Sequence, residues 1–442
     1  METFPHGIWR PCSPQPVAPP PEPAALPFLR APFGRLRALL RSQRRLSILS
    51  IVHAGGGGTL LTNQDLMRSL SAAHDTFILG FGPDKWVLWR AQDEMTRVEE
   101  VKFQAVWRGG APLSGDREAA LADLLARWRF DVAHVRSMLG SGPEAISVLR
   151  RAGLPVVLSF HDFTAVCPTV QLLDASHTYC AGRCTAGEVD CAPPAKWFSD
   201  ITRLKHAYVH EWRSRMAKAL SDVSAFVTTS PGAAALIVSH YPQLKRRIHI
   251  IEHGRDIRRH QAGIAPRQGS SVRIVVLGVQ TPAKGRVLVE ALARLNAASG
   301  RPFEIHLLGD DPPDFADVPG VVAHGRYERE ELPAKLAAIG PSFSLLPSIW
   351  PETYSHTLTE SWAAGIPVLA SNLGAPAERI RRRGGGWLLD PASPAAWKDC
   401  LERVIAAPWE WSAKAKEIQV MPSRTATAMA AEYQALYRRI AL

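Results

Sequence analysis

The sequence predicts an α/β protein built from two tandem domains, each a parallel sheet covered by helices. Short runs of Val, Ile and Leu recur without polar alternation, which is typical of strands buried on both faces. Helical patterns separate these runs, as in βαβ units. A stretch rich in Gly, Pro and charge at residues 253–266 interrupts the series, and we interpret it as an interdomain linker.

The predicted strands fall into two groups, one on each side of this linker. The first group is 46–52, 77–79, 132–135, 155–160, 224–227 and 248–251, and the second is 273–277, 303–308, 343–346 and 366–370. We therefore expect two Rossmann-like domains, at residues 45–255 and 268–409, facing each other across a cleft.

The N-terminal tail, residues 1–44, has a different composition. Ten of the 35 prolines lie in the first 32 residues, which predicts a disordered or polyproline segment. Residues 34–45 follow as a basic amphipathic stretch. Such a stretch either rests on an anionic membrane surface or is a solvated helix or linker.

Composition limits the function classes. The 442 residues are 46% hydrophobic and 21% charged, with a net charge of +11, which favours polyanions, anionic lipid surfaces or phosphorylated small molecules as partners. Zinc-finger spacing and RNA-binding aromatic signatures are missing from the sequence, which disfavours nucleic acid. With no signal peptide and no apolar run of about 18 residues, we expect a cytoplasmic protein, in solution or peripheral at the inner membrane face.

Two glutamates with seven residues between them stand out in the second domain. Glu352 lies in a Pro-bounded loop after a predicted strand, and Glu360 lies in the short helix that follows. This order places both at the carboxyl edge of a parallel sheet, where such sheets bind ligands. Carboxylates only accept hydrogen bonds, so the pair suits sugar and ribose hydroxyls. The alternative is two solvated glutamates on an amphipathic helix.

Other motifs follow predicted strands on the same edges. Four glycines at 55–58 follow the first strand and would let backbone amides approach a ligand, although a flexible turn explains them equally well. The next helix is expected to begin at Thr62, with Asp65 in a shortened capping box. His161, beside Asp162, is either a proton-handling residue or a structural histidine.

Lys284, before Gly285, marks a predicted helix entrance in the second domain. A lysine at such a place favours a diphosphate, and the alternative is a surface lysine beside a turn. Further glycines end the predicted strands on this edge; they are Gly278, Gly309 and Gly325, the last followed by Arg326. Three arginines at 381–383 are expected to be a solvated helix end, and contact with phosphate is the alternative.

Four of the six cysteines form a cluster in one loop: Cys167, Cys180, Cys184 and Cys191. In a cytosolic protein such a group suits a structural zinc ion better than disulfides. The spacing is looser than the paired CxxC of structural zinc sites, so free thiols are the alternative.

Together these motifs resemble the family-4 retaining glycosyltransferases of GT-B fold, from about residue 45 to the C-terminus. The segment 351–360 looks like the family's two-glutamate motif. The glycine loop, the His161–Asp162 pair, the Lys284–Gly285 pair and residues 374–379 agree with the family in order and spacing.

The resemblance implies a role for each candidate residue. Glu360 would hold the donor's ribose, Glu352 the transferred sugar, and Lys284 the diphosphate. The amides of Gly56, Gly57 and Gly58 would lie near the phosphate and acceptor, and His161 near the anomeric carbon. The nucleotide would also contact the strand-end residues Gly278, Gly309, Gly325 and Arg326.

The resemblance also implies an activity: transfer of a sugar from a nucleotide-diphosphate sugar to a glycan or lipid-linked acceptor in bacterial polysaccharide biosynthesis. Residues 45–255 would be the acceptor domain, joined by a crossover helix within 410–442, and 268–409 the donor domain. The chemistry would need no metal or other cofactor. Val279 stands where many relatives have arginine, and residues 59–62 leave the usual glycine-loop continuation. Two alternatives remain: a scaffold of this fold that has lost turnover, or another two-Rossmann enzyme such as an epimerase or phosphorylase.

Overall fold

The computed structural model describes residues 44–53, 57–107, 112–174, 176–184, 206–300, 302–309 and 316–441. Residues 45–442 form one compact unit of the chain. The predictions for the tail, for Gly56 and for Cys191 lie outside the described residues.

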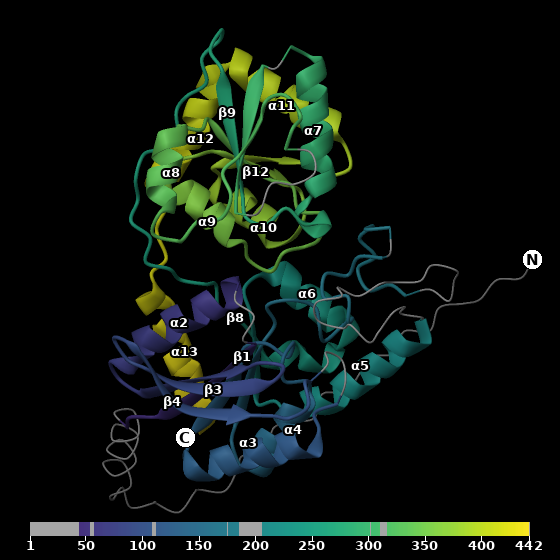
Figure 1. Ribbon diagram of the computed structural model, residues 1–442, viewed down its shortest axis with the longest axis vertical. Coiled ribbons are helices and arrows are strands. Elements are labelled where there is room, and N and C mark those ends of the chain that lie inside the picture. The colour runs from purple at the N-terminus through teal and green to yellow at the C-terminus, as the bar shows by residue number, and fades with distance from the viewer. Residues whose placement is uncertain are drawn as a thin grey trace, which may run out of the picture. The chain divides into compact units, whose positions relative to one another are not determined.

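The described part of the chain forms two separate sheets (Figure 1). The first has the order β4-β3-β2-β1-β5-β6-β7-β8, parallel from β2 to β8, with β3 and β4 added antiparallel. Its strands are β1 Ser47–His53, β2 Asp75–Phe81, β3 Lys85–Ala91, β4 Met95–Lys102, β5 Val132–Val135, β6 Val156–Ser159, β7 Ala225–Thr228 and β8 Ile248–Ile250.

The second sheet has the order β11-β10-β9-β12-β13-β14 and is parallel throughout. Its strands are β9 Val272–Leu277, β10 Phe303–Leu308, β11 Val321–Ala323, β12 Phe343–Leu346, β13 Val368–Ser371 and β14 Gly386–Leu389. The predicted α/β architecture of two domains with parallel sheets is therefore confirmed.

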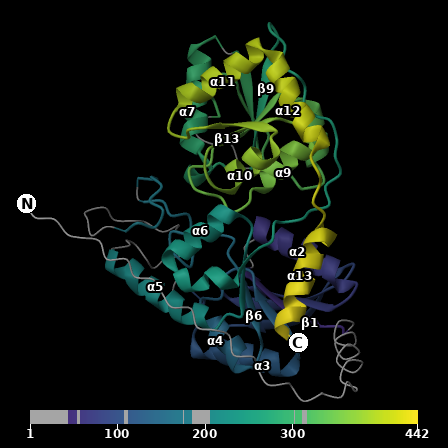
Figure 2. The same ribbon diagram turned by 180° about the vertical axis from the view of Figure 1, so that it is seen from behind.

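Helices cover these sheets, and the last one returns to the first sheet. The helices are α2 Gly58–Ser71, α3 Gly115–Arg127, α4 Glu144–Arg151, α5 His206–Ser221, α6 Pro231–His240, α7 Arg286–Ala298, α8 Leu332–Ile339, α9 His356–Ala363, α10 Gly374–Arg383, α11 Pro394–Ala406, α12 Pro408–Val420 and α13 Ala426–Ala441. Figure 2 shows α13 beside α2, where Met429 and Tyr433 pack on Leu66 and Met67. None of the helices in the described residues is long and apolar enough to cross a membrane.

Burial explains why the central strands were predictable. In β1, Leu49 and Ile51 join one hydrophobic cluster while Ile48 and Val52 join another, so both faces of the strand are covered. Strands buried in this way read as continuous apolar runs.

Each sheet has one topological switch point, where the chain leaves for opposite sides of the sheet. In the first sheet the chain passes from β1 to β2 on one side and later enters β5 on the other side of β1. In the second sheet, β9 is flanked in the same way by β10 and β12. Ligands of open α/β sheets bind beside the carboxyl ends of the strands at such points.

Candidate active site

The loop between β12 and α9 carries Glu352 at the switch point of the second sheet. Two glycines with positive φ let neighbouring segments approach this loop. A Cβ on Gly374 (φ 65°) would lie 2.7 Å from the backbone N of Glu352, and one on Gly285 (φ 84°) would lie 2.0 Å from the carbonyl oxygen of Pro347. Only glycine fits at these two positions without moving the backbone.

Lys284 and Glu352 form an ion pair at this switch point. The Lys284 Nζ lies 2.8 Å from Oε1 of Glu352, which also accepts a hydrogen bond from Ser348. The carboxylate side chain is 6% exposed, whereas the lysine is 40% exposed. The lysine therefore neutralises a buried carboxylate and still presents part of its ammonium to solvent or to a ligand.

Glu360, on α9, pairs with a residue that the sequence did not single out. Arg255 Nη1 lies 2.5 Å from Glu360 Oε1, and the two side chains are 6% and 11% exposed. Arg255 comes from the segment that joins the two domains, in the stretch interpreted as a linker. The second carboxylate is thus also held by a cation. Burial, followed by the charge of Glu360, raises the pKa of the nearby Tyr327.

Three of the predicted glycines gather at the ends of β9, β10 and β11. A Cβ on Gly309 would lie 2.7 Å from Cα of Gly278, and Gly309 donates its N–H to the carbonyl of Gly325 at 2.9 Å. All three have positive φ. Arg326 follows Gly325 directly. These four candidates therefore lie together at the carboxyl edge, beside the loop between β12 and α9 (residues 347–355), called the glutamate loop below.

Histidines from both domains stack at the facing edges. The ring of His253 lies 5.1 Å from that of His161 and 5.6 Å from that of His356. Burial, with nearby cations such as Arg136, holds the pKa of His161 and of His253 well below the ordinary value. Burial, followed by the charges of Arg255 and other cations, lowers the pKa of His356 to about 3. These imidazoles are neutral at physiological pH.

The start of α2 touches the second domain. The helix begins at Gly58, so the prediction of a start at Thr62 is wrong; the Thr62 hydroxyl instead donates to the carbonyl of Gly58 within the helix, at 2.7 Å. The same hydroxyl therefore accepts from Nε2 of His356, at 2.9 Å. A Cβ on Gly58 would lie 2.8 Å from the His356 ring, and Gly57 has φ 91°. Asp65 pairs with Arg329 rather than capping the helix.

More contacts join the two carboxyl edges. The Thr353 hydroxyl donates to the carbonyl of His161 at 2.7 Å, and Thr229 at the end of β7 donates to the carbonyl of Thr353. Tyr354 donates to the carbonyl of His253 at 3.1 Å. The glutamate loop of the second sheet therefore lies against the carboxyl edge of the first, where His161 stands.

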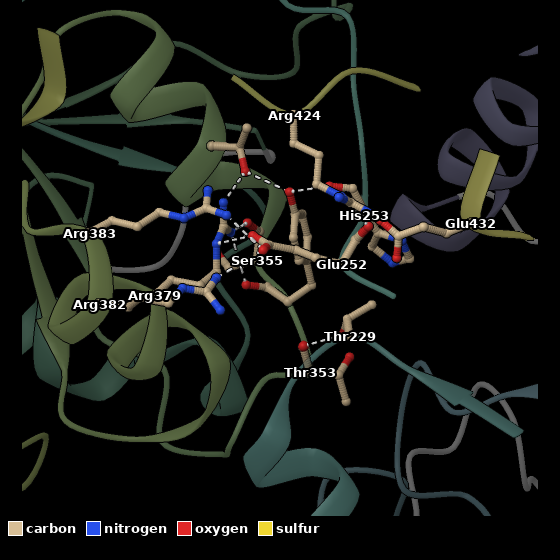
Figure 3. Close-up of polar contacts among 12 residues, drawn as sticks. Thr229, Glu252, His253, Thr353, Ser355, Arg379, Arg382, Arg383, Arg424 and Glu432 are labelled. Carbon is tan, nitrogen blue, oxygen red and sulfur yellow. Dashed lines mark hydrogen bonds and ion pairs between the residues drawn. The ribbon is translucent and has the colours of Figure 1, made fainter. Parts of the chain in front are cut away.

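Three arginines of α10 form ion pairs with Glu252, next to the segment that joins the two domains. Figure 3 shows the guanidinium groups of Arg379, Arg382 and Arg383 gathered around Glu252, with Arg424 on the other side. Arg379 also donates to the backbone carbonyl of Ser355, next to α9. The prediction of a solvated helix end at 381–383 is wrong for Arg383, which is 19% exposed. Its carboxylate partner lies 131 positions away, which the local sequence does not reveal.

The described cysteines make ordinary contacts. Cys167 accepts from the Thr169 hydroxyl at 3.3 Å, and Cys180 donates to the carbonyl of Leu172 at 3.1 Å. Burial raises the pKa of both thiols. Cys184 is half-buried, and within the described ranges no three candidate ligands group around a metal position. These thiols do not fit zinc as they stand; with Cys191 outside the described residues, the zinc site stays a prediction.

This arrangement suits polar recognition of a hydroxyl-rich, anionic ligand. Two buried carboxylates offer acceptors, Lys284 offers a partly exposed cation, and the glycine-lined strand ends expose backbone groups. Positioning and charge neutralisation are what such a site supplies to group transfer.

Comparisons with known proteins agree with this architecture. Residues 54–259 match the family described as Glycosyltransferase Family 4, and residues 271–407 match Glycosyl transferases group 1. A search of curated proteins found no match to the sequence.

Solved structures of the same fold cover nearly the whole chain. Sucrose-phosphate synthase from Thermosynechococcus elongatus is 15% identical with a TM-score of 0.60, over 89% of this chain and 99% of that one. A glycosyltransferase from Rickettsia africae is 15% identical with a TM-score of 0.56, over 90% and 98%. The HepE protein of Anabaena, solved in complex with UDP, is 14% identical with a TM-score of 0.51, over 89% and 95%.

The two family matches follow the two sheets in order, and the solved structures share the arrangement of paired α/β domains. With the glutamate loop and its lysine at the second switch point, the chain belongs to the family-4, group 1 glycosyltransferases and has the GT-B fold.

Proposed function

We propose that this glycosyltransferase moves a sugar from a nucleotide-diphosphate sugar to a glycan or lipid-linked glycan acceptor, with retention of anomeric configuration. The observation that carries the proposal is the Lys284–Glu352 ion pair at the second switch point. Glu360 lies on α9, the short helix that follows the loop of Glu352. It unites a cation for the diphosphate with acceptors for sugar and ribose hydroxyls.

Each donor contact has a candidate residue. Lys284 faces the diphosphate, Glu352 accepts from hydroxyls of the transferred sugar, and Glu360 accepts from the ribose. Gly278, Gly309 and Gly325, with Arg326, lie against the nucleotide. The complex of HepE with UDP supports a nucleotide of this class for a protein of the same fold.

The transfer itself breaks the bond between the anomeric carbon and the β-phosphate oxygen. The acceptor hydroxyl forms the new bond on the same face of the sugar, and its proton passes to the departing phosphate oxygen. The protein supplies charge neutralisation by Lys284 and a dry, neutral imidazole, His161, beside the reacting carbon. No protein nucleophile is needed, and we propose that no metal takes part.

The acceptor and the site of action form a second part of the proposal. We place the reaction in bacterial polysaccharide biosynthesis, in the cytoplasm or peripherally at the inner membrane face. The net charge of +11 and the basic stretch at 34–45 support contact with anionic lipid. Recovery of full-length protein, but not of a version lacking residues 1–44, on anionic liposomes would support this contact, and equal recovery would refute it.

The activity is tested in two steps. A thermal-shift screen with UDP, GDP, ADP and their sugars first identifies the nucleotide, and NMR of the product then reports its anomeric configuration. A product with the donor's configuration supports the proposal, and an inverted product refutes retention. Nucleotide binding without sugar release or transfer indicates a scaffold, and pyridoxal absorbance indicates a phosphorylase.

A further inference from the structure

Arg136 is a buried cation at the switch point of the first sheet. It directly follows β5, and its backbone N–H donates to the carbonyl of Ile51 in β1 at 2.8 Å. The residue therefore lies between the carboxyl ends of the two strands at which the chain diverges, the place where such a sheet receives a ligand. Its exposure is 0%.

Among the described residues, Nη1 is the one nitrogen of this guanidinium that has a hydrogen-bond partner. Nη1 donates to the Tyr433 hydroxyl at 3.0 Å, which ties the residue to α13. Nε and Nη2 are buried and make no hydrogen bond to any residue that the structure describes. These two nitrogens form one edge of the planar group, and their N–H bonds point the same way. That edge is the fork that binds two oxygens of a phosphate or carboxylate at once.

No carboxylate balances the charge of Arg136 within the described residues. None of the ion pairs between them includes it, and Asp162, the carboxylate next to His161 in sequence, accepts hydrogen bonds from the N–H and hydroxyl of Thr164 at 2.8 and 2.5 Å. The surrounding imidazoles of His134, His161 and His253 are kept neutral by burial and by the arginine itself. A buried and uncompensated cation is costly, typically by several kcal/mol.

Anchoring α13 does not account for this arrangement. The contact with Tyr433 consists of the hydrogen bond from Nη1 and of the guanidinium carbon lying 5.5 Å from the centre of the tyrosine ring. The helix is also held by Tyr437, whose hydroxyl lies 2.5 Å from Nδ1 of His134. A neutral side chain could donate to Tyr433 without burying a charge. The fork edge therefore needs another explanation.

We propose that Arg136 is an anion-binding residue that receives a phosphoryl group of the substrates at the first switch point. The inference rests on the proposed function, which supplies two sources of that group: the diphosphate of the donor and a phosphate carried by the acceptor. Arg136 would supply a cation from the first domain, in addition to Lys284 in the second.

The test is isothermal titration of the full chain with inorganic pyrophosphate. Arg136→Lys keeps the charge but loses the fork, and Arg136→Gln loses both. Each is expected to weaken pyrophosphate binding at least about tenfold, the loss of one charge-assisted hydrogen bond. Tyr433→Phe removes the hydrogen bond from Nη1 and leaves Nε and Nη2 unchanged. The affinity of this variant for pyrophosphate should therefore stay within about twofold of wild type.

A second titration, in the presence of saturating UDP, separates the two sources. If UDP abolishes the Arg136-dependent binding, the group is the donor's diphosphate; if the binding persists, it is a phosphate of the acceptor.

The inference is overturned if the wild type does not bind pyrophosphate, or if both Arg136 variants bind it within about twofold of wild type. A lowered melting temperature with unchanged affinity would show that Arg136 only anchors α13. Such a failure leaves the proposed function intact, because that depends on the effect of Lys284 and Glu360 variants on nucleotide binding.

Discussion

The two switch points hold cations in opposite ways. At the second, Lys284 is 40% exposed and pairs with the buried Glu352 at 2.8 Å. At the first, Arg136 is fully buried, has a phenol as its hydrogen-bond partner and is surrounded by neutral imidazoles. Within the described residues, the cation at one switch point is therefore balanced by a carboxylate, and the cation at the other is not.

This difference in charge balance means that the two sites would respond differently to an anionic ligand. A site whose charges already cancel is preorganised and can exchange an internal contact for a ligand at little cost. A site with a buried, unbalanced cation gains most when an anion arrives. Under the proposed function, the second domain would hold the sugar and ribose, and the first would complete the neutralisation of phosphate.

The largest expected effect comes from breaking the balanced site. Lys284→Met removes the cation that we propose faces the diphosphate, and it leaves Glu352 buried without its partner. Transfer should fall about 10²- to 10³-fold, as when one preorganised charge-stabilising group is lost. Initial rates with the identified donor measure this effect.

Two further variants show whether the loss of transfer in Lys284→Met comes from the missing charge. Lys398→Met breaks a comparable ion pair on α11, with Glu402 at 2.6 Å, and should keep the wild-type rate. The double change Lys284→Met and Glu352→Gln should recover stability but not transfer. Full transfer by Lys284→Met would show that the second switch point does not handle the diphosphate.

A smaller effect concerns the histidines that lie between the two domains. The folded-state pKa of His356 is about 3, against 6.5 in the unfolded chain, and those of His161 and His253 are also well below 6.5. The unfolded state therefore binds more protons below pH 6.5, and stability is present above this pH and lost as the pH falls towards 3. Each imidazole contributes at most about 1.4 kcal/mol per pH unit.

Urea unfolding at pH 7 and pH 5 measures this loss. His356→Gln should reduce the dependence on pH, since one proton no longer binds on unfolding. A midpoint that does not move between these pH values would contradict the burial of the stacked rings.

The smallest effect lies at the start of α9. Ser355 has φ 78°, a region that glycine occupies without strain, and its hydroxyl caps the helix at Leu358. Ser355→Gly should stabilise the chain by about 0.5–1 kcal/mol, because relief of strain exceeds a capping loss of a few tenths. Ser355→Ala keeps the strain and loses the cap, so it should be destabilised by about 1 kcal/mol. Urea midpoints compare the two, and equal midpoints would refute the strained loop.

The central strands could be predicted from sequence because burial on both faces leaves continuous apolar runs. Four strands were not predicted: β4, β11 and β14, which lie at sheet edges, and β3, which lies between β2 and β4 inside the first sheet. The edge strand β8 was predicted, from the apolar run at 248–251. β4 carries Arg97, Glu99 and Glu100 in the sequence Met-Thr-Arg-Val-Glu-Glu-Val-Lys, and β11 and β14 have three and four residues. Edge strands face solvent on one side and tolerate charge, so their pattern resembles that of a loop.

Candidate site residues could be predicted from sequence where they directly follow predicted strands. Lys284 and Glu352 follow neighbouring strands, so strand order brings them together. Arg255 and Glu360 are 105 positions apart, and Arg136 and Tyr433 are 297 apart. Such partners depend on how the linker and the last helix return, which no local pattern encodes. The start of α2 was misplaced for a similar reason, because the glycine loop continues directly into the helix.

The most direct test of the proposed donor site compares two conservative substitutions at the switch point of the second sheet. Nucleotide affinity and transfer rate are measured for Glu360→Gln and Glu352→Gln. We predict that Glu360→Gln weakens nucleotide binding about tenfold, whereas Glu352→Gln keeps the affinity within about twofold and lowers transfer at least about 100-fold. If both variants keep the wild-type affinity and rate, the donor does not bind at this edge of the second sheet.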